Sequence, residues 1–264
     1  MSLSEWFDFH LAAKLGNEGY GSTYEYVAKF NLLKKWSAAY GLRGKISRLV
    51  IMGLPQKYGL SLDFLMWAKF LEVRRIYLWK NCSYGKVDRF LNACKAYCQL
   101  IGLGNLSIEV VEELQDVVID ENVFCVSCEV FQMLSDSARR GYMNACKRAR
   151  CSAIFVPNFF NNDHRIYTKL ATIENNDFNP YSEGVSILSS GYIDLPPVPS
   201  GFELPRKEES DYEKVKVTLA DKVILFIISF WLNLAEAIIK VLSKQYYIKK
   251  AHLYWILING VREK

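Results

Sequence analysis

Short apolar runs alternate with longer stretches of helical periodicity between positions 48 and 157. The apolar runs predict strands at 48–52, 75–79, 107–111, 124–128 and 153–156. The stretches between them repeat apolar residues every three or four positions, which predicts helices at 61–72, 86–101 and 137–150. Because strands joined through helices pair in parallel, the pattern predicts an α/β fold with a mostly parallel, twisted sheet covered by helices on both faces.

The flanking regions have different patterns. Residues 5–40 predict two helices, separated by the glycine-rich turn at 16–21. Beyond the fifth strand, the asparagine-rich residues 161–180 predict an exposed loop around a short helix, and 186–195 predicts a strand. Three prolines predict an extended connection at 195–201. We therefore expect an N-terminal helical cap at 1–46 and an α/β domain at 47–264, with a loop-rich insertion at 159–220 and a C-terminal helix and strand (223–242 and 251–259).

The most hydrophobic stretch of the chain is 223–242. Its polar residues, at steps of four and three, form one stripe along a helix: Ser229, Asn233, Glu236, Lys240 and Ser243. Glu236 stands four residues before Lys240, which favours an ion pair on the helix surface. Since Glu and Asn are costly in the middle of a bilayer, we expect a broadly buried helix and no transmembrane span. A homo-oligomer contact or a membrane-surface face are the alternatives.

The composition narrows the class of protein. Half of the 264 residues are hydrophobic, enough for a sizeable core, and the formal net charge is +5. Five basic residues and no acid lie in 139–150, which is typical of a solvated helix face, with an anionic partner as the sharper hypothesis. No nucleic-acid-binding motif accompanies it. The first residues, MSLSEWFDF, lack the basic and apolar regions of a secretory signal, so we expect a cytoplasmic protein.

The seven cysteines have no disulfide-framework spacing, and their odd number fits a reducing compartment. Cys125 and Cys128 form a CxxC motif. Their offset of three within a predicted strand puts the side chains on opposite faces, so they could not share a zinc ion. Cys94 and Cys98 could share a helix face, but none of the three histidines is close to them in sequence. No metal site is predicted.

The order of elements resembles that of class I S-adenosylmethionine-dependent methyltransferases. The segments that carry the resemblance are LVIMG at 49–53, LGNLSI at 103–108, FCVSCEVFQML at 124–134 and CSAIFVPN at 151–158. This resemblance implies a Rossmann-like sheet that ends in an antiparallel C-terminal strand. It also implies S-adenosylmethionine as a small-molecule cofactor and a methyltransferase-like activity, with the methyl acceptor unidentified.

The resemblance implies cofactor contacts in the turns after the first four strands. The matching positions are Gly53, Leu54, Lys57, Lys80, Asn81, Glu112, Glu113, Cys128 and Glu129. No catalytic residue is implied, because methyl transfer depends mainly on positioning. His164 lies in the loop after the fifth strand. Tyr20, Tyr24 and Tyr26 could line a lid over the site, or belong to a packed or exposed aromatic face.

The cofactor loop is degenerate in several positions. The family's acidic residue before the loop is replaced by Ile51, and its second and third glycines by Pro55 and Lys57. Proline has no N–H and restricts the backbone. Lys80 stands where a ribose-binding acid is expected, and an ammonium group accepts no hydrogen bond, whereas Asn81 could accept one.

These departures leave three functions open. The first is an active methyltransferase with an atypical loop. The second is a catalytically inactive protein of the same fold that serves as a binding or scaffold protein. The third is a binder of a different, phosphorylated nucleotide, because Lys57 and Lys80 could pair with a phosphate.

Overall fold

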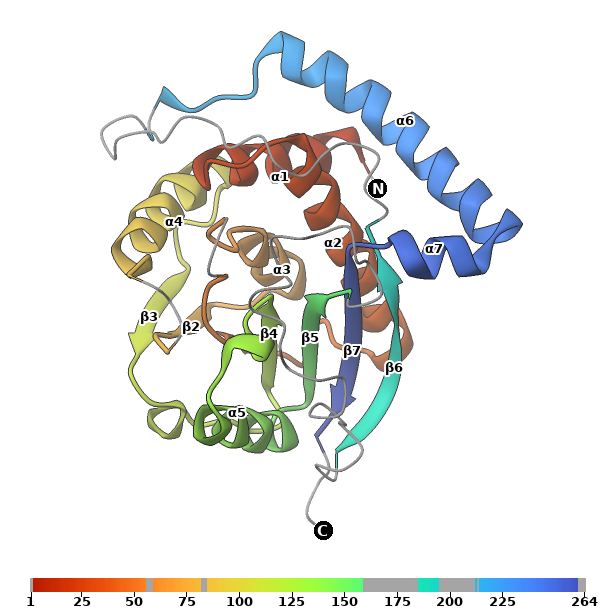
Figure 1. Cartoon of the computed structure of the whole chain (residues 1–264). Helices are drawn as coiled ribbons and strands as arrows, with labels where there is room; N and C mark the ends of the chain where they lie inside the picture. The colour runs from red at the N-terminus through yellow and green to blue at the C-terminus, as the bar shows by residue number, and fades with distance from the viewer. Residues whose placement is uncertain are drawn as a thin grey trace.

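The computed structural model describes residues 2–55, 59–81, 85–158, 185–194, 212 and 214–260. Its centre is a seven-stranded sheet with the strand order β3-β2-β1-β4-β5-β7-β6 (Figure 1). The strands are β1 (Arg48–Ile51), β2 (Arg75–Trp79), β3 (Ser107–Val111), β4 (Val123–Cys128), β5 (Cys151–Pro157), β6 (Ser186–Ile193) and β7 (Leu253–Asn259). The five strands predicted between 48 and 157 are thus confirmed within two residues at each end.

The strand pairing confirms the predicted fold class. β1 pairs in parallel with both β2 and β4, with Ile51 opposite Leu78 on one side and opposite Val126 on the other. β3 and β5 extend the parallel sheet on its two sides. β7 runs antiparallel between β5 and β6. This is a Rossmann-like sheet with an antiparallel C-terminal strand.

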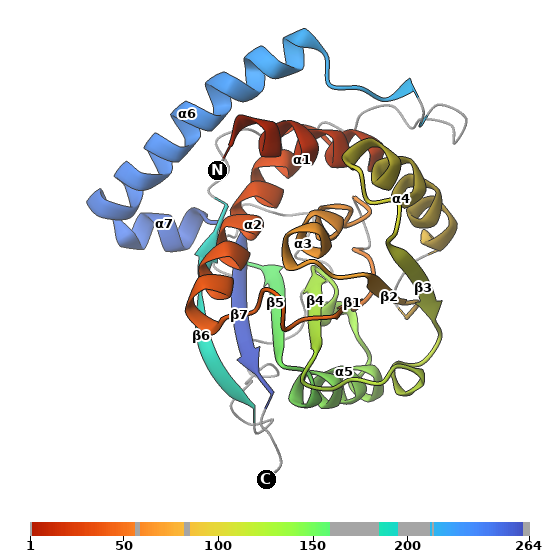
Figure 2. The ribbon, with the colours of Figure 1, turned by 180° about the vertical axis from the view of Figure 1, so that it is seen from behind.

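The helices cover both faces of the sheet. They are α1 (Leu3–Leu15), α2 (Tyr20–Tyr40), α3 (Asp63–Leu71), α4 (Val87–Ile101), α5 (Asp136–Arg148), α6 (Leu219–Leu242) and α7 (Lys244–Lys250), with short 3-10 helices at Leu114–Asp116 and Phe131–Met133. Seen from behind, α2, α3 and α4 lie in front of the sheet and α5 lies on its far side (Figure 2). The predicted basic segment at 139–150 is largely α5.

Alternation along the strands divides the core into two layers. Leu49 and Ile51 pack in the layer beneath α2 and α3, whereas Val50 and Met52 pack in the layer with α5. Cys125 and Cys128 fall in different layers, as the strand periodicity predicted.

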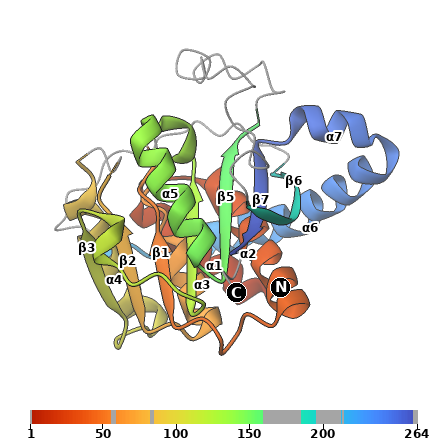
Figure 3. The same cartoon turned by 90° about the horizontal axis from the view of Figure 1, so that it is seen from below.

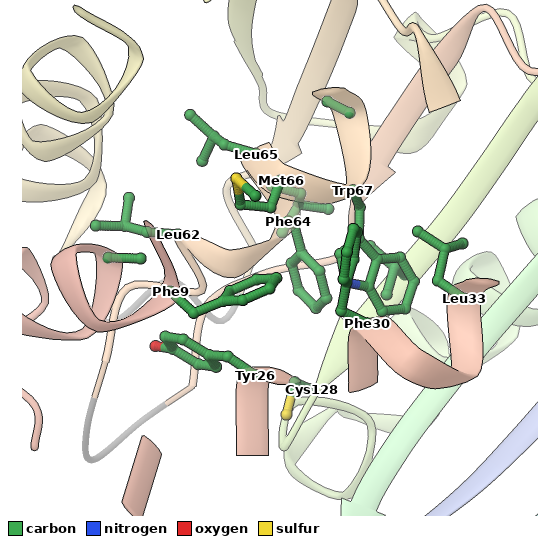
Figure 4. Packing of buried hydrophobic residues seen from close by; sticks show 14 of the residues in the cluster. Phe9, Tyr26, Phe30, Leu33, Leu62, Phe64, Leu65, Met66, Trp67 and Cys128 are labelled. Carbon is green, nitrogen blue, oxygen red and sulfur yellow. The ribbon is translucent and has the colours of Figure 1, made fainter. Parts of the chain in front are cut away.

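The N-terminal helices α1 and α2 supply an aromatic part of the first layer. Ser2 and Glu5 form a capping box that starts α1. Phe9 and Phe30 meet edge to face with centroids 5.1 Å apart. Figure 4 shows these rings packed beside Phe64 and Tyr26, with the thiol of Cys128 at the edge of the group.

The prediction that the helix at 223–242 is broadly buried is wrong. Helix α6 runs along the outside of the molecule past α1 (Figure 1), and in its most apolar 18-residue window only 6% is buried. The physical reason is that its acids face inward. The Asp221 carboxylate binds the ammonium of Lys14 at 2.7 Å and accepts a hydrogen bond from Tyr20. The Glu236 carboxylate accepts hydrogen bonds from the hydroxyls of Tyr24 and Tyr247.

Candidate functional site

The site lies at the carboxyl edge of the parallel strands. The chain leaves β1 toward β2 on one side and leaves β4 toward β5 on the other, so the strand order reverses between β1 and β4. In open α/β sheets, ligands bind beyond the strand ends at such a switch point. Side chains from several distant segments meet there.

Asp194 and His252 reach this edge because β7 is antiparallel. Leu253, at the start of β7, pairs with Pro157 at the end of β5 and with Ile193 at the end of β6. The residues just outside these pairs therefore face each other. The backbone N–H of His252 donates to the carbonyl of Asp194 at 2.6 Å, and its Nδ1 lies 3.1 Å from Asp194 Oδ2.

Glu129 follows β4 in an unusual backbone conformation. Its φ is +56°, which a non-glycine residue adopts only when the surroundings hold it there. The backbone N–H donates to the carbonyl of Phe155 at 2.9 Å. The carboxylate Oε1 lies 3.7 Å from His252 Nε2 and accepts no hydrogen bond from the described residues.

Helix α2 contributes a buried lysine. Glu25 and Lys29 are four residues apart and therefore share one helix face. The side chain of Lys29 is only 1% exposed. Its Nζ lies 2.9 Å from Glu25 Oε1, 3.0 Å from Asp63 Oδ2 in the first turn of α3, and 3.5 Å from Cys128 Sγ.

We call the seven converging residues the switch-point cluster: Glu25, Lys29, Asp63, Cys128, Glu129, Asp194 and His252. It contains four carboxyl groups against the two basic groups Lys29 and His252. Burial raises the pKa of Glu129, Asp63 and Asp194 above their ordinary values, because few positive charges compensate them. The cluster thus has a deficit of positive charge.

The basic groups of the cluster are correspondingly held in their charged forms. Burial alone would lower the pKa of His252, but the hydrogen bond to Asp194 and the charges of Glu129, Asp194 and Glu25 raise it to about 10. Burial also opposes the charge of Lys29, yet Asp63 and its neighbours raise the lysine pKa above its usual value. Both groups are cations at neutral pH.

Glu18 lies next to the cluster, under the loop that follows β1. The φ of Gly59 is +74°, and a Cβ there would lie 2.5 Å from Glu18 Oε1, so a side chain at this position would displace the Glu18 carboxyl group. The hydroxyl of Tyr26 donates to Glu18. Burial raises the pKa of Glu18 to about 8, so this acid carries a proton at neutral pH.

Three members of the cluster have a spacing that suits a cation. The ligand atoms of Glu25, Asp194 and His252 all lie within 4.8 Å of one another. However, the Lys29 ammonium already neutralises Glu25, and His252 is itself charged. The cluster is therefore better described as an acid-rich charge network than as a metal centre.

Of the positions that the resemblance implied, Gly53 and Leu54 lie in the turn after β1. The φ of Gly53 is +95°, and a Cβ there would lie 2.9 Å from the Asn81 carbonyl and 3.0 Å from Val130 Cγ1. Glycine is thus required by the close approach of the β2 and β4 turns. Leu54 is fully buried. Lys57 lies outside the described residues.

The positions after β2 and β3 form an exposed rim. Lys80 Nζ pairs with Glu112 Oε1 at 2.6 Å, and both side chains are at least half exposed. Asn81 and Glu113 are also exposed. Among the described members of the implied set, Cys128 and Glu129 are the two that join the buried cluster.

Sequence reasoning missed Glu25, Lys29, Asp63, Asp194 and His252. Lys29 carried one signal, since it follows Tyr26 by three positions and precedes Leu33 by four on an apolar helix face. Asp194 and His252 carried none, because they meet only through the pairing of β6 with β7. His164 lies outside the described residues.

Tyr20, Tyr24 and Tyr26, considered above as a possible lid, pack against other side chains of the protein. Tyr24 and Tyr26 are 2% and 3% exposed, and Tyr20 stacks on His10 with centroids 4.6 Å apart. Their hydroxyls bind carboxylates of the protein itself.

Replacing Gly53 by alanine should lower the free energy of unfolding by about 2–4 kcal/mol, because it combines positive φ with crowding. Gly102 is a matched control, since its φ is +75° and a Cβ there would meet nothing within 4 Å. Gly102→Ala should cost only about 1 kcal/mol. Urea unfolding compares the two; equal losses would show that the turns do not crowd Gly53.

No family model matches the chain, and no curated protein matches it. The solved structures that are similar include the methyltransferase domain of bacterial CtHen1, which is 10% identical, with 87% of this chain and 98% of that chain covered and a TM-score of 0.43. Geranyl diphosphate C-methyltransferase from Streptomyces coelicolor A3(2) is 11% identical, with 88% and 78% covered and a TM-score of 0.45. A SAM dependent methyltransferase from Aquifex aeolicus is 14% identical, with 61% and 84% covered and a TM-score of 0.37. At these values the fold rests on the strand order and pairing of the sheet itself.

Proposed function

We propose that the chain binds S-adenosylmethionine beside the switch-point cluster and transfers its methyl group to an acceptor that is not yet identified. The excess of buried carboxyl groups over buried cations at the switch point supports this proposal. S-adenosylmethionine carries a sulfonium and an ammonium group against one carboxylate. A ligand with a net positive charge would supply the charge that the cluster lacks.

The residues present fit this cofactor in part. Glu129 has a buried carboxylate oxygen without a hydrogen-bond donor among the described residues, and it would hold a positive group of the ligand. Asn81 and Glu113, on the rim after β2 and β3, would bind its nucleoside. Lys80 does not fit a ribose contact, and its pairing with Glu112 shows how the chain satisfies that ammonium instead.

The chain's own groups would prepare the acceptor. S-adenosylmethionine, when bound, would supply a methyl group attached to a sulfonium sulfur, and that sulfur would keep the electrons of the broken C–S bond and become a neutral thioether. Glu129, whose pKa is raised by burial, would take the proton that the acceptor nucleophile loses. His252, 3.7 Å away, would stabilise the Glu129 carboxylate before that transfer.

The N-terminal cap at 1–46 belongs to the same proposal, because it supplies Glu25 and Lys29 to the cluster. A reducing, cytoplasmic compartment is also proposed. It would keep as thiols the six described cysteines, all buried and none in a disulfide.

Calorimetric titration with S-adenosylmethionine and S-adenosylhomocysteine tests the proposal. The two ligands differ by one methyl group and one positive charge. We expect the charged ligand to bind about tenfold more tightly or better, and Glu129→Gln to remove most of that preference. Glu72→Gln is the control, since it removes an exposed carboxylate at the far end of α3 that pairs with Arg43.

A titration without heat at millimolar concentrations of either ligand would contradict the proposal. It would favour the second function, a binding protein of this fold without catalysis. One observation supports that alternative: other parts of the protein contact the turn after β1, at the place where a cofactor would bind. Lys86 Nζ donates to the Pro55 carbonyl at 2.7 Å, and Val130 and Asn81 crowd Gly53. Adding phosphorylated nucleotides to the same titrations tests the third function.

A further inference from the structure

Helix α6 presents large apolar residues to the solvent as well as to the protein. Asp221, Leu225 and Glu236 lie on the side that faces the protein. The opposite side presents large apolar residues at successive helical positions: Val223, Ile227, Phe230, Leu234, Ile238 and Val241. Eleven of the sixteen exposed large hydrophobic side chains in the described part of the chain are on this helix. We call these eleven the outer face of α6.

The outer face is too large and continuous to remain in water. Phe230 and Trp231 at its centre are each 59% exposed. The helix has 24 residues and is therefore about 36 Å long. Contiguous apolar patches of this extent on soluble proteins mark a contact with another molecule or with a membrane.

The charged residues around the outer face indicate which kind of molecule covers it. Among residues 219–250 the only acids are Asp221 and Glu236, and both are bound to groups of the protein body. The basic residues of the same stretch are Lys222, Lys240, Lys244, Lys249 and Lys250, of which all but Lys250 are exposed. The rim of the outer face therefore presents cations to the solvent.

A second copy of the chain would be a poor occupant of this face. In a two-fold contact through α6, each positively charged rim would approach an identical one, with no exposed acid of α6 or α7 to oppose it. An anionic bilayer surface complements the same arrangement, since its acyl chains accept the apolar residues and its phosphates accept the lysines.

The anchoring of α6 favours a helix that lies in the membrane surface rather than across it. By length and composition alone the helix could cross a membrane. However, Asp221 near one end and Glu236 near the other hold it against α1, α2 and α7. Figure 3 shows α7 and the adjoining part of α6 beyond the β6 edge of the sheet, clear of α5. We propose that the outer face of α6 docks the protein on an anionic membrane surface.

Vesicle co-sedimentation tests this docking with the full chain. We expect binding to phosphatidylcholine vesicles that contain phosphatidylglycerol, and weaker binding to phosphatidylcholine alone. Phe230→Glu/Trp231→Glu should lower the partition coefficient about a hundredfold. The control Leu100→Glu/Val118→Glu adds the same charge at side chains 51% and 69% exposed elsewhere, and should bind as the unchanged protein does. Equal loss in both variants would overturn the proposal.

Two further measurements separate the other occupants. Lipids brominated near the headgroup should quench Trp231 fluorescence more than lipids brominated at the bilayer centre, with Trp231→Phe as the reference; the reverse order would show a spanning helix. Light scattering without vesicles should give a monomer. A dimer that Phe230→Glu/Trp231→Glu converts to monomers would assign the outer face to a second copy instead.

Discussion

Replacing Lys29 by methionine should lower the free energy of unfolding by about 3–5 kcal/mol, because it leaves the buried carboxylates of Glu25 and Asp63 without their cation. Methionine fills a similar volume, so the loss reports charge rather than packing. Urea unfolding at neutral pH measures it. The cost should fall as pH is lowered, since the unpaired carboxyls can then take up protons.

Lys34→Met is the matched control, on the same helix and paired with Glu5 at 2.6 Å. Its side chain is 31% exposed, and a partly exposed pair of this kind contributes less than about 1 kcal/mol. The double variant Lys29→Met/Asp63→Asn should recover part of the loss, because one stranded charge is removed with the lysine. If Lys29→Met costs no more than Lys34→Met, the cluster does not depend on its buried cation.

The second large effect is a loss of stability with rising pH that depends on His252. The pKa of this histidine is raised from 6.5 to about 10 in the folded chain. The stabilisation that protonated His252 gives the folded state is therefore complete below pH 6.5, and it is lost as the pH rises toward 10. Between these values the folded state holds a proton that the unfolded state has released, so stability should fall by about 1.4 kcal/mol per pH unit.

The raised pKa values of Glu129 and Asp194 act in the same direction at lower pH, because these acids also bind protons more tightly in the folded chain. Unfolding curves for the unchanged protein and for His252→Gln, measured from pH 6 to pH 9, isolate the histidine. We expect the variant to be less stable at pH 6 and its pH dependence above neutrality to be much shallower. Parallel profiles would show that His252 is not a cation in the folded protein.

The fold could be predicted because its signals are local. The apolar run at 48–52 and the periodic stretch at 86–101 each indicate their own structure through neighbours a few residues away. The short apolar strands joined by helices then require a parallel sheet. Residues 114–122 have no clear periodicity in the sequence, and the structure forms a 3-10 turn there at Leu114–Asp116.

The candidate site could be predicted only where one residue follows one strand. Cys128 ends the fourth strand and Glu129 comes directly after it, so the position of that strand in the sequence brought both into the implied set. Asp194 and His252 are 58 positions apart, and nothing near either residue indicates the other. The resemblance implies cofactor contacts at Lys80 and Glu112, and the structure joins these two side chains in an exposed ion pair.

The sequence alone determined which segments of this protein are strands and helices, and that one long helix carries a polar stripe opposite an apolar face. Periodicity contains that information because each side chain's direction follows from its place in the local backbone. Only the tertiary structure decided that Asp221 and Glu236 of α6 face the protein while most of its large apolar residues are exposed, and that four carboxyl groups meet two cations at the switch point. Those outcomes depend on Tyr24, Lys14 and Lys29 being brought within bonding distance by the packing of distant segments, which no local pattern encodes.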